Sequence, residues 1–300
     1  MNCNNKLSVA IIGSGNIGMD LVYKIKRSAF LECEWIVGRN PESKNLSKLK
    51  KMGYQVSSDG IKTLIDNPYN FDIVFDATTA QAHMAHAPIL KRMGKFAIDL
   101  TPARVGEICV PCLNEDDCLN CDNVNMVTCG GQATVPLAYA VSKVIDRIKY
   151  IEMVSTIASQ SAGKGTRENI DEYIHTTNSA LRRFTGVNNV KSMMVLNPTD
   201  PPVTMRNTLY IEGEEFDLDE ISEATEKIIK RISKYVPGYK MIVEPTILDK
   251  GILAITVQVE GSGDYLPKYA GNLDIITCAA VEIAERKARE ILLQEGAVPF

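Results

Sequence analysis

The chain has 300 residues, of which 45% are hydrophobic and 23% are charged, a composition typical of a folded globular protein. A formal net charge of −4 argues against a nucleic-acid binder, because that function needs a basic face. The N-terminal segment lacks the pattern of a signal peptide, and no apolar run approaches the ~20 residues that cross a bilayer, so we expect a cytoplasmic protein without membrane contact.

The first half of the chain alternates short apolar runs with helical patterns. The patterns predict strands at 7–12, 33–37, 73–75 and 96–98, and helices at 16–26, 46–52 and 80–93. Strands that alternate with helices form a parallel sheet covered on both faces. The first half is therefore predicted to be a Rossmann-like, doubly wound α/β domain.

The second half has longer strands and fewer helices. Strands are predicted at 150–159, 191–196, 203–212, 240–243 and 253–259, and helices at 166–184, 218–235 and 272–295. This pattern favours an α+β domain with an antiparallel or mixed sheet covered by helices on one face. The pattern of strands and helices changes near residue 130, and two domains suit a length above the ~250 residues at which single cores stop growing.

A glycine-rich motif directly follows the first predicted strand and opens the first predicted helix. The motif has the form G-x-G-x-x-G and consists of Gly13, Ser14, Gly15, Asn16, Ile17 and Gly18. Its glycines permit a tight turn, close approach of a pyrophosphate, and close packing of helix on strand. The helix N-terminus offers free N–H groups to the phosphates, so the motif predicts a dinucleotide site.

The second strand ends in Val37-Gly38-Arg39-Asn40, without the acidic residue that usually binds the ribose of NAD. Arg39 can pair with a 2′-phosphate or stack on adenine. NAD is favoured, and NADP remains open.

Cys129 lies in the most informative stretch of the chain. A short strand is predicted at 125–127, two glycines after Cys129 suggest a turn, and helical spacing runs from 133 to 145. A cysteine at a strand-to-helix junction lies near free N–H groups, which lower the pKa of a thiol and can stabilise an oxyanion. Because a predicted dinucleotide-binding domain precedes Cys129 in the chain, the interpretation of Cys129 as a nucleophile is favoured over that of a small buried cysteine.

At these residues the sequence resembles the acylating acetaldehyde dehydrogenases of bacterial aromatic meta-cleavage pathways. The resemblance covers nearly the whole chain and rests on motifs that occur in the same order, at 10–18, 72–78, 98–102, 123–136, 159–167, 196–198 and 269–275. That family resembles glyceraldehyde-phosphate and semialdehyde dehydrogenases in architecture. The resemblance implies an NAD-binding domain at 1–129 with 268–300, and a catalytic and dimerisation domain at 130–267.

The resemblance implies that acetaldehyde, and often propanal, is oxidised with NAD and CoA to the acyl-CoA through a thioester on Cys129. It also implies a homodimer, joined in a heterotetramer to 4-hydroxy-2-oxovalerate aldolase at the end of an aromatic degradation pathway. Further contacts to the cofactor are implied for Ser161, Ala162, Gly163, Lys164, Gly165, Thr166, Arg167, Asn169, Asp171 and Asn272.

One departure concerns Asn207, where the family often carries an acid. An aspartate there is a candidate for orienting or activating the nucleophile, whereas asparagine can hydrogen-bond but cannot take a proton. Asn207 is therefore expected to be a polar orienting group, with no assigned general base.

Two other groups suggest metal binding and are given other interpretations. Cys109, Cys112, Cys118 and Cys121 form two C-x-x-C pairs with only five residues between them, shorter than in zinc sites, so free thiols are expected. His83 and His86 share a predicted helix and are expected at a polar surface or cap. No metal site is predicted.

Three alternatives remain. A phosphorylating semialdehyde dehydrogenase would use phosphate in place of CoA and usually a Cys–His pair, which three histidines in the chain make less favourable. A non-enzymatic NAD-binding regulator would need no reactive thiol. A structural subunit would bind an aldolase without turnover.

Overall fold

The computed structural model describes residues 6–248 and 251–294, which form two compact units. Unit 1 holds the described residues up to Met126 and from Thr277 onward, and unit 2 runs from Val127 to Ile276. The predicted end of the last helix at Glu295 lies outside the described residues.

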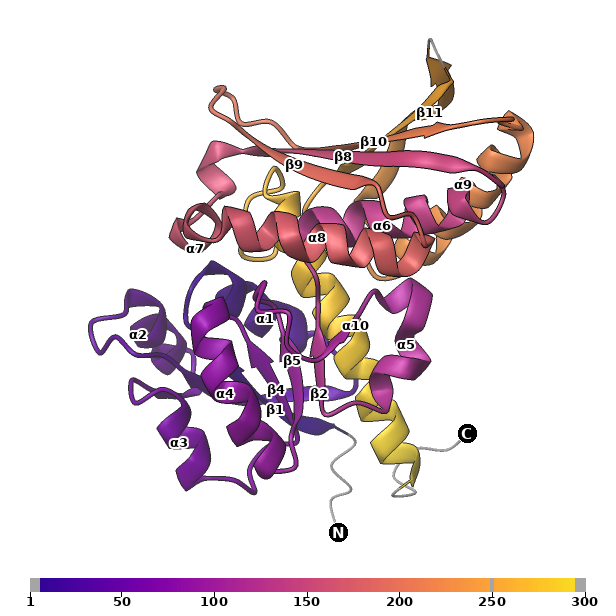
Figure 1. The fold of residues 1–300 in the computed structure, drawn as a ribbon. Coiled ribbons are helices and arrows are strands. Elements are labelled where there is room, and N and C mark those ends of the chain that lie inside the picture. The colour runs from indigo at the N-terminus through magenta and orange to yellow at the C-terminus, as the bar shows by residue number, and fades with distance from the viewer. Residues whose placement is uncertain (1–5, 249–250, 295–300) are drawn as a thin grey trace. The chain divides into compact units, whose positions relative to one another are not determined.

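Unit 1 is built on a parallel sheet, whose seven strands within the described residues are labelled in Figure 1 where visible. Their order across the sheet is β3-β2-β1-β4-β5-β7-β6. The strands are β1 (Leu7–Ile12), β2 (Leu31–Val37), β3 (Gln55–Ser57), β4 (Ile73–Asp76), β5 (Phe96–Asp99), β6 (Glu107–Ile108) and β7 (Asn123–Asn125). The doubly wound parallel sheet predicted from the sequence is confirmed.

Helices cover both faces of this sheet because successive strand side chains point to opposite sides. Ala10 and Ile12 of β1 belong to one apolar cluster with Leu64 and Leu90. Ile11 points the other way, 3.6 Å from the position that a Cβ on Gly18 would take. The helices of the unit are α1 (Asn16–Lys26), α2 (Lys44–Lys51), α3 (Ile61–Asp66), α4 (Ala80–Arg92), α5 (Pro111–Leu119) and the Thr277-onward part of α10 (Gly271–Gln294).

Unit 2 is built on a five-stranded sheet in the described part of the chain, with the order β11-β12-β10-β8-β9. The pair β8–β9 is parallel and the other pairs are antiparallel, which confirms the predicted mixed sheet. The strands are β8 (Ile148–Ala158), β9 (Val190–Asn197), β10 (Met205–Gly213), β11 (Tyr239–Leu248) and β12 (Ile252–Val259).

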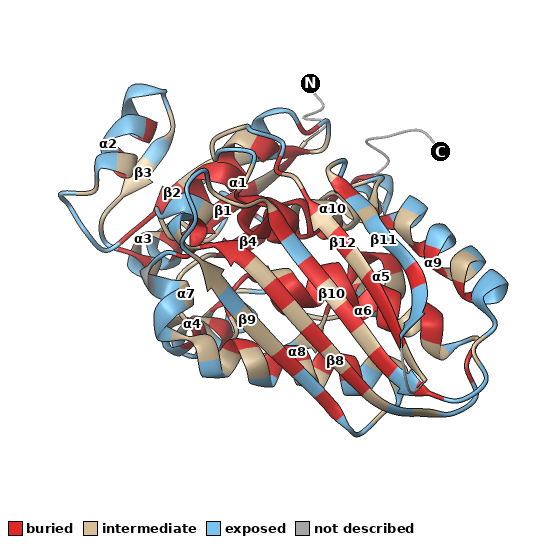
Figure 2. Ribbon diagram, turned by 90° about the horizontal axis from the view of Figure 1, so that it is seen from above, coloured by how far each residue is buried: buried red, intermediate tan, exposed pale blue. Residues whose placement is uncertain are grey.

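One face of this sheet packs against three helices, α6 (Cys129–Ser142), α8 (Ile170–Thr185) and α9 (Leu218–Ile232) (Figure 1). Along β8 the residues Ile151, Met153, Ser155 and Ile157 are buried, and those between them are half-buried. Figure 2 shows this alternation along β8 and β10. Because side chains alternate along a strand with a period of two residues, every second side chain faces the helices.

The helix predicted at 166–184 is two helices, α7 (Lys164–Glu168) and α8, and Asn169 between them has the non-helical angles φ −123° and ψ 35°. The turn predicted after Cys129 is also wrong, because Gly130 and Gly131 already lie inside α6. Searched over the described residues, the chain has no helix with the length and apolarity that a membrane span requires.

Candidate active site

The glycine motif in unit 1 has the geometry that its spacing predicts. Gly13 has φ +117°, a conformation that L side chains rarely adopt, and its N–H donates to the carbonyl of Val37. A Cβ on Gly18 would lie 1.9 Å from the carbonyl oxygen of Gly13. Side chains at either position would push the loop away from the start of α1, which begins at Asn16 without a side-chain cap.

The end of β2 lies next to this loop. Arg39 is exposed there, and a Cβ on Gly38 would be only 3.0 Å from the Ser14 hydroxyl. The backbone oxygen of Ser14 accepts a hydrogen bond of 2.7 Å from the Asn45 amide, and its hydroxyl lies 3.2 Å from that of Ser43. The start of α2 therefore supports the glycine loop, a contribution that sequence reasoning missed.

Cys129 is the first residue of α6 in unit 2, which places its thiol at a helix N-terminus as predicted. The preceding residue, Thr128, caps the helix, and its hydroxyl accepts a hydrogen bond of 2.9 Å from the N–H of Gly131. Val127 has φ +60°, an outlier for a β-branched residue. Backbone strain of this kind is concentrated at functional sites.

A short chain of hydroxyls fixes the cap. Thr177 on α8 donates to the carbonyl of Tyr173 at 2.8 Å, so its proton is already engaged. Thr128 lies 2.8 Å from the same Thr177 oxygen and therefore donates to it. The proton direction is fixed by this bond, and the start of α6 is held against α8.

The pKa of the Cys129 thiol is about 11, not lowered as the helix N-terminus alone predicts. Burial raises it, and this outweighs the backbone N–H groups of Gly130 and Cys129 and the Tyr173 hydroxyl, which lower it. The expectation that the helix N-terminus lowers the pKa of Cys129 below its usual value is therefore wrong. The residue as a whole is half-buried, so part of it still reaches solvent.

Two of the buried side chains on the sheet of unit 2 are polar. Asn207 on β10 pairs in register with Ser155 on β8, and both are fully buried. Among the described residues, neither the Asn207 amide nor the Ser155 hydroxyl makes a hydrogen bond of good geometry, although the Tyr173 hydroxyl lies beside Ser155. A buried polar group without a partner is costly, so these groups point to a bound polar ligand or water beside them.

The segment from Ser161 to Asp171 forms a short helical turn and α7. Ser161 is buried, and its hydroxyl donates to the carbonyl of Ala158. Arg167 donates to the carbonyl and hydroxyl of Ser159 at 2.9 Å each and to the carbonyl of Ala162 at 3.1 Å. The guanidinium of Arg167 therefore stabilises this loop through hydrogen bonds to its backbone and to Ser159.

The remaining residues of the segment differ in exposure. Gly163 and Gly165 are exposed, Thr166 is half-buried, and Asp171 lies in the first turn of α8. The Asn169 amide donates to the carbonyl of Gly165 at 2.6 Å. The side chain of Lys164 lies outside the described part of the structure.

Asn272 is the second residue of α10 and lies in unit 2. Its side chain is buried, and its amide oxygen has no hydrogen-bond partner among the described residues. It is thus a free acceptor where the sequence predicts a cofactor contact.

The two histidines on α4 differ in burial. His83 does not lie at a polar surface, so the expectation is wrong for this residue. Its ring is fully buried, with Nδ1 2.9 Å from an Asp76 oxygen and Nε2 3.6 Å from an Asp99 oxygen. His86 reaches the same Asp76 oxygen at 2.8 Å. The two imidazoles hold the pKa of Asp76 down at about 2, although burial opposes them, whereas burial raises that of Asp99 to about 6.

The clustered cysteines serve packing in unit 1. Cys109, Cys112 and Cys118 are buried around α5, and the thiols of Cys109 and Cys118 are hydrogen-bonded. Burial raises the pKa of Cys109 well above its usual value, which keeps the thiol protonated. Cys121 is half-buried, and its thiol lies 3.5 Å from the carbonyl of Asp117.

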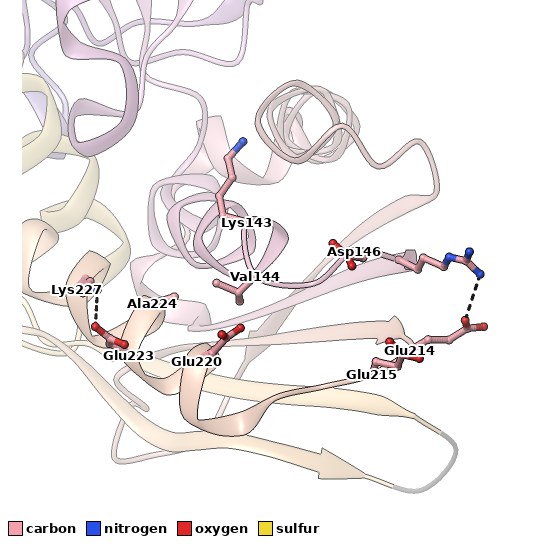
Figure 3. A pocket seen from close by; sticks show the side chains of 10 residues that line it. Lys143, Val144, Asp146, Glu214, Glu215, Glu220, Glu223, Ala224 and Lys227 are labelled. Atoms are coloured by element: carbon pink, nitrogen blue, oxygen red, sulfur yellow. Dashed lines mark ion pairs between the residues drawn. The ribbon is translucent and has the colours of Figure 1, made fainter.

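An open pocket of about 820 Å³ lies at the other end of α6 (Figure 3). Its walls are mostly charged, and two ion pairs, Arg147–Glu214 and Lys227–Glu223, span parts of it. Lys143 caps the C-terminus of α6, about 20 Å from Cys129 at a rise of 1.5 Å per residue. A small apolar substrate would gain little from such walls, so this pocket is separate from the thiol site.

A dinucleotide-type glycine loop in unit 1 and a thiol at the capped start of a helix in unit 2 are features found in two-unit dehydrogenases that use a cysteine. Solved structures support the fold: aspartate semialdehyde dehydrogenase II from Vibrio cholerae, with its ligand ASA, matches with a TM-score of 0.64 at 12% identity. The match covers 97% of this chain and 99% of that one.

Curated relatives narrow the class. Residues 129–267 match the family model described as prokaryotic acetaldehyde dehydrogenase, dimerisation. The chain is 51% identical over 98% of its length to the acetaldehyde dehydrogenase of Carboxydothermus hydrogenoformans, 97% of which is covered. It is 47% identical to that of Bacillus cereus, with 97% of this chain and 96% of the relative covered. The chain belongs to the acetaldehyde dehydrogenase family, which confirms the resemblance found in the sequence.

Proposed function

We propose that this protein oxidises acetaldehyde, and also propanal, with NAD and CoA to the acyl-CoA and NADH. The observation that carries the proposal is the half-buried Cys129 at the capped start of α6, in the unit whose sheet also buries the unpartnered amide of Asn207. The curated relatives are acetaldehyde dehydrogenases, and a thiol is the nucleophile that can carry an acyl group to CoA.

The residues present fit a nicotinamide dinucleotide. The loop is closely packed at Gly13 and Gly18, whereas open space lies beside Gly15 at the start of α1, where a pyrophosphate would fit, and Asn272 offers a free buried acceptor. Unit 1 would hold the phosphates and adenosine, with Arg39 next to the ribose. Contacts from Ser161 to Asp171 and from Asn272 to the cofactor are proposed on the resemblance in sequence alone. When bound, the dinucleotide accepts the hydride from the substrate.

The residues of unit 2 supply the covalent chemistry. The Cys129 thiolate attacks the aldehyde carbon to give a thiohemiacetal, and the oxyanion that forms lies near the N–H groups at the start of α6. After oxidation the substrate is a thioester on Cys129, and the thiol of CoA displaces it. Asn207 orients polar groups at the site and takes no proton.

We further propose a homodimer formed through unit 2, in keeping with the dimerisation description of the matching family model. In the part of the chain that the structure describes, no element covers the sheet face opposite α6, α8 and α9, which carries Val154, Thr208 and Tyr210 (Figure 1). An association with 4-hydroxy-2-oxovalerate aldolase at the end of an aromatic degradation pathway is proposed on the resemblance in sequence.

The test measures NADH formation from acetaldehyde with and without CoA, on the parent chain and on Cys129→Ala. We expect CoA-dependent turnover that is lost in Cys129→Ala and kept in Cys33→Ala, a matched change at another half-buried thiol. Replacing CoA by phosphate and NAD by NADP decides between the alternatives. Phosphate-dependent turnover would point to a phosphorylating enzyme, and dinucleotide binding without any turnover would point to a regulator.

A further inference from the structure

Tyr173 lies beside the nucleophile without having been suggested by any sequence motif. It sits on α8, its ring is buried, and a Cβ on Gly130 would lie 2.0 Å from its hydroxyl oxygen and 3.2 Å from its Cζ. Position 130 therefore has to be a glycine for the hydroxyl to occupy this place. The same hydroxyl lies within hydrogen-bonding reach of the Cys129 sulfur.

This hydroxyl has the side chains of Ser155 and Thr128 and the backbone N–H of Gly130 beside it. Among the described residues, the Tyr173 O–H makes no hydrogen bond of good geometry. The nearby hydroxyls of Thr128 and Thr177 already donate within the cap of α6. A buried donor without a partner is costly, unless an acceptor forms beside it during the reaction.

We propose that Tyr173 is a catalytic residue whose hydroxyl donates a hydrogen bond to the Cys129 sulfur when the thiol ionises, and so stabilises the thiolate. The proposal rests on the proposed function, in which Cys129 is the nucleophile. Hydrogen bonds to a charged acceptor are about twice as strong as neutral ones, so this contact gains strength as the sulfur becomes negative.

Tyr173 acts here as a donor and not as a base. Burial raises the pKa of its phenol above the usual value, and a negative charge on Cys129 raises it further, so the hydroxyl keeps its proton. The proton of Cys129 leaves to water, because the residue is half-exposed. Tyr173 thus stabilises the thiolate as a donor, in a chain where Asn207 cannot take the proton of the thiol.

Among the described residues of unit 2, the groups that face the thiol are otherwise uncharged. The backbone N–H groups of Cys129 and Gly130 face it from α6, and Tyr173 faces it from α8. Ser155 of β8 lies next to the tyrosine hydroxyl, and Met153 reaches towards Gly130. Tyr173 is therefore the titratable neighbour whose removal should change the ionisation of Cys129.

The experiment is alkylation of Cys129 by iodoacetamide as a function of pH, followed by mass spectrometry of its peptide, without cofactor or substrate. In Tyr173→Phe the pKa of Cys129 should rise by about one pH unit, a ten-fold loss of thiolate at a given pH. Tyr239→Phe is the matched control: its buried hydroxyl binds the carbonyl of Ala133 on the same helix, away from the thiol.

Turnover gives a second readout. The acid limb of the kcat/KM profile should move upward by the same amount in Tyr173→Phe, while the rates of both proteins converge at high pH. Superimposed alkylation profiles for the parent and Tyr173→Phe, or an equal shift in Tyr239→Phe, would overturn the proposal. If the parent chain lacked acetaldehyde turnover, the proposed function would fail, and the alkylation result would still decide the role of Tyr173.

Discussion

Replacing Asp99 by asparagine should change how the stability of unit 1 depends on pH. Asp99 is fully buried at the end of β5, where it accepts hydrogen bonds of 2.7 Å from the N–H of Thr101 and the amide of Asn125. Despite these bonds, burial raises its pKa from 3.8 to about 6. The folded unit therefore holds a proton that the unfolded chain releases.

The magnitude follows from the size of this rise. At about 1.4 kcal/mol per pKa unit, the difference between 3.8 and about 6 corresponds to about 3 kcal/mol. This stabilisation is fully present below pH 3.8 and is lost as the pH rises through about 6, and about 2 kcal/mol of the loss falls between pH 4.5 and 7.5. His83, whose pKa is also raised, adds to the loss in the same direction, and Asp99 is one cause of that rise.

Asp99→Asn removes the buried charge and keeps an oxygen for the N–H of Thr101. The lost hydrogen bond to Asn125 costs the same at every pH, so it shifts the whole stability curve without changing its slope. We expect the free energy of unfolding of the variant, relative to the parent, to rise by about 2 kcal/mol from pH 4.5 to 7.5.

The assay is guanidinium unfolding followed by fluorescence of Trp35, the one tryptophan of the chain, which lies on β2 of the same unit. Asp59→Asn, the same change at an exposed aspartate of unit 1, is the control and should leave the slope as it is. Parallel stability curves for the parent and Asp99→Asn would refute the reasoning, because they would mean that Asp99 is ionised equally in both states.

Three further changes test the packing around the two sites. Gly18→Ala places a Cβ 1.9 Å from a carbonyl oxygen of the loop, so NADH affinity measured by fluorescence should fall at least about ten-fold, and unchanged affinity would contradict a cofactor role for the loop. Tyr239→Phe removes a buried 2.6 Å hydrogen bond to Ala133 and should lower the free energy of unfolding by about 1–2 kcal/mol in a denaturant titration. Gly130→Ala should cost about 1–3 kcal/mol in the parent and clearly less in Tyr173→Phe, where the clashing hydroxyl is gone; additive costs in this double-mutant cycle would disprove their contact.

The sequence by itself determined the features that depend on local geometry. The loop of Gly13 and Gly18 could be predicted because its conformation is set by which residues lack a Cβ. The parallel and mixed sheets followed from side-chain periodicity and from the lengths of the segments between strands. The helix that follows Cys129 could be predicted, although its start was expected at residue 133 after a turn, whereas Gly130 and Gly131 are already helical.

Burial and neighbours were decided by the tertiary structure alone. Tyr173 contacts Gly130 although the two are 43 positions apart in the chain, and Asn207 pairs with Ser155 through strand register. No local sequence pattern therefore predicts either contact. The raised pKa of Cys129 has the same origin, because a helix N-terminus is visible in the sequence and the surrounding burial is not. Periodicity and turn chemistry act within a few residues, whereas desolvation and hydrogen bonding depend on which distant segments the packed core brings together.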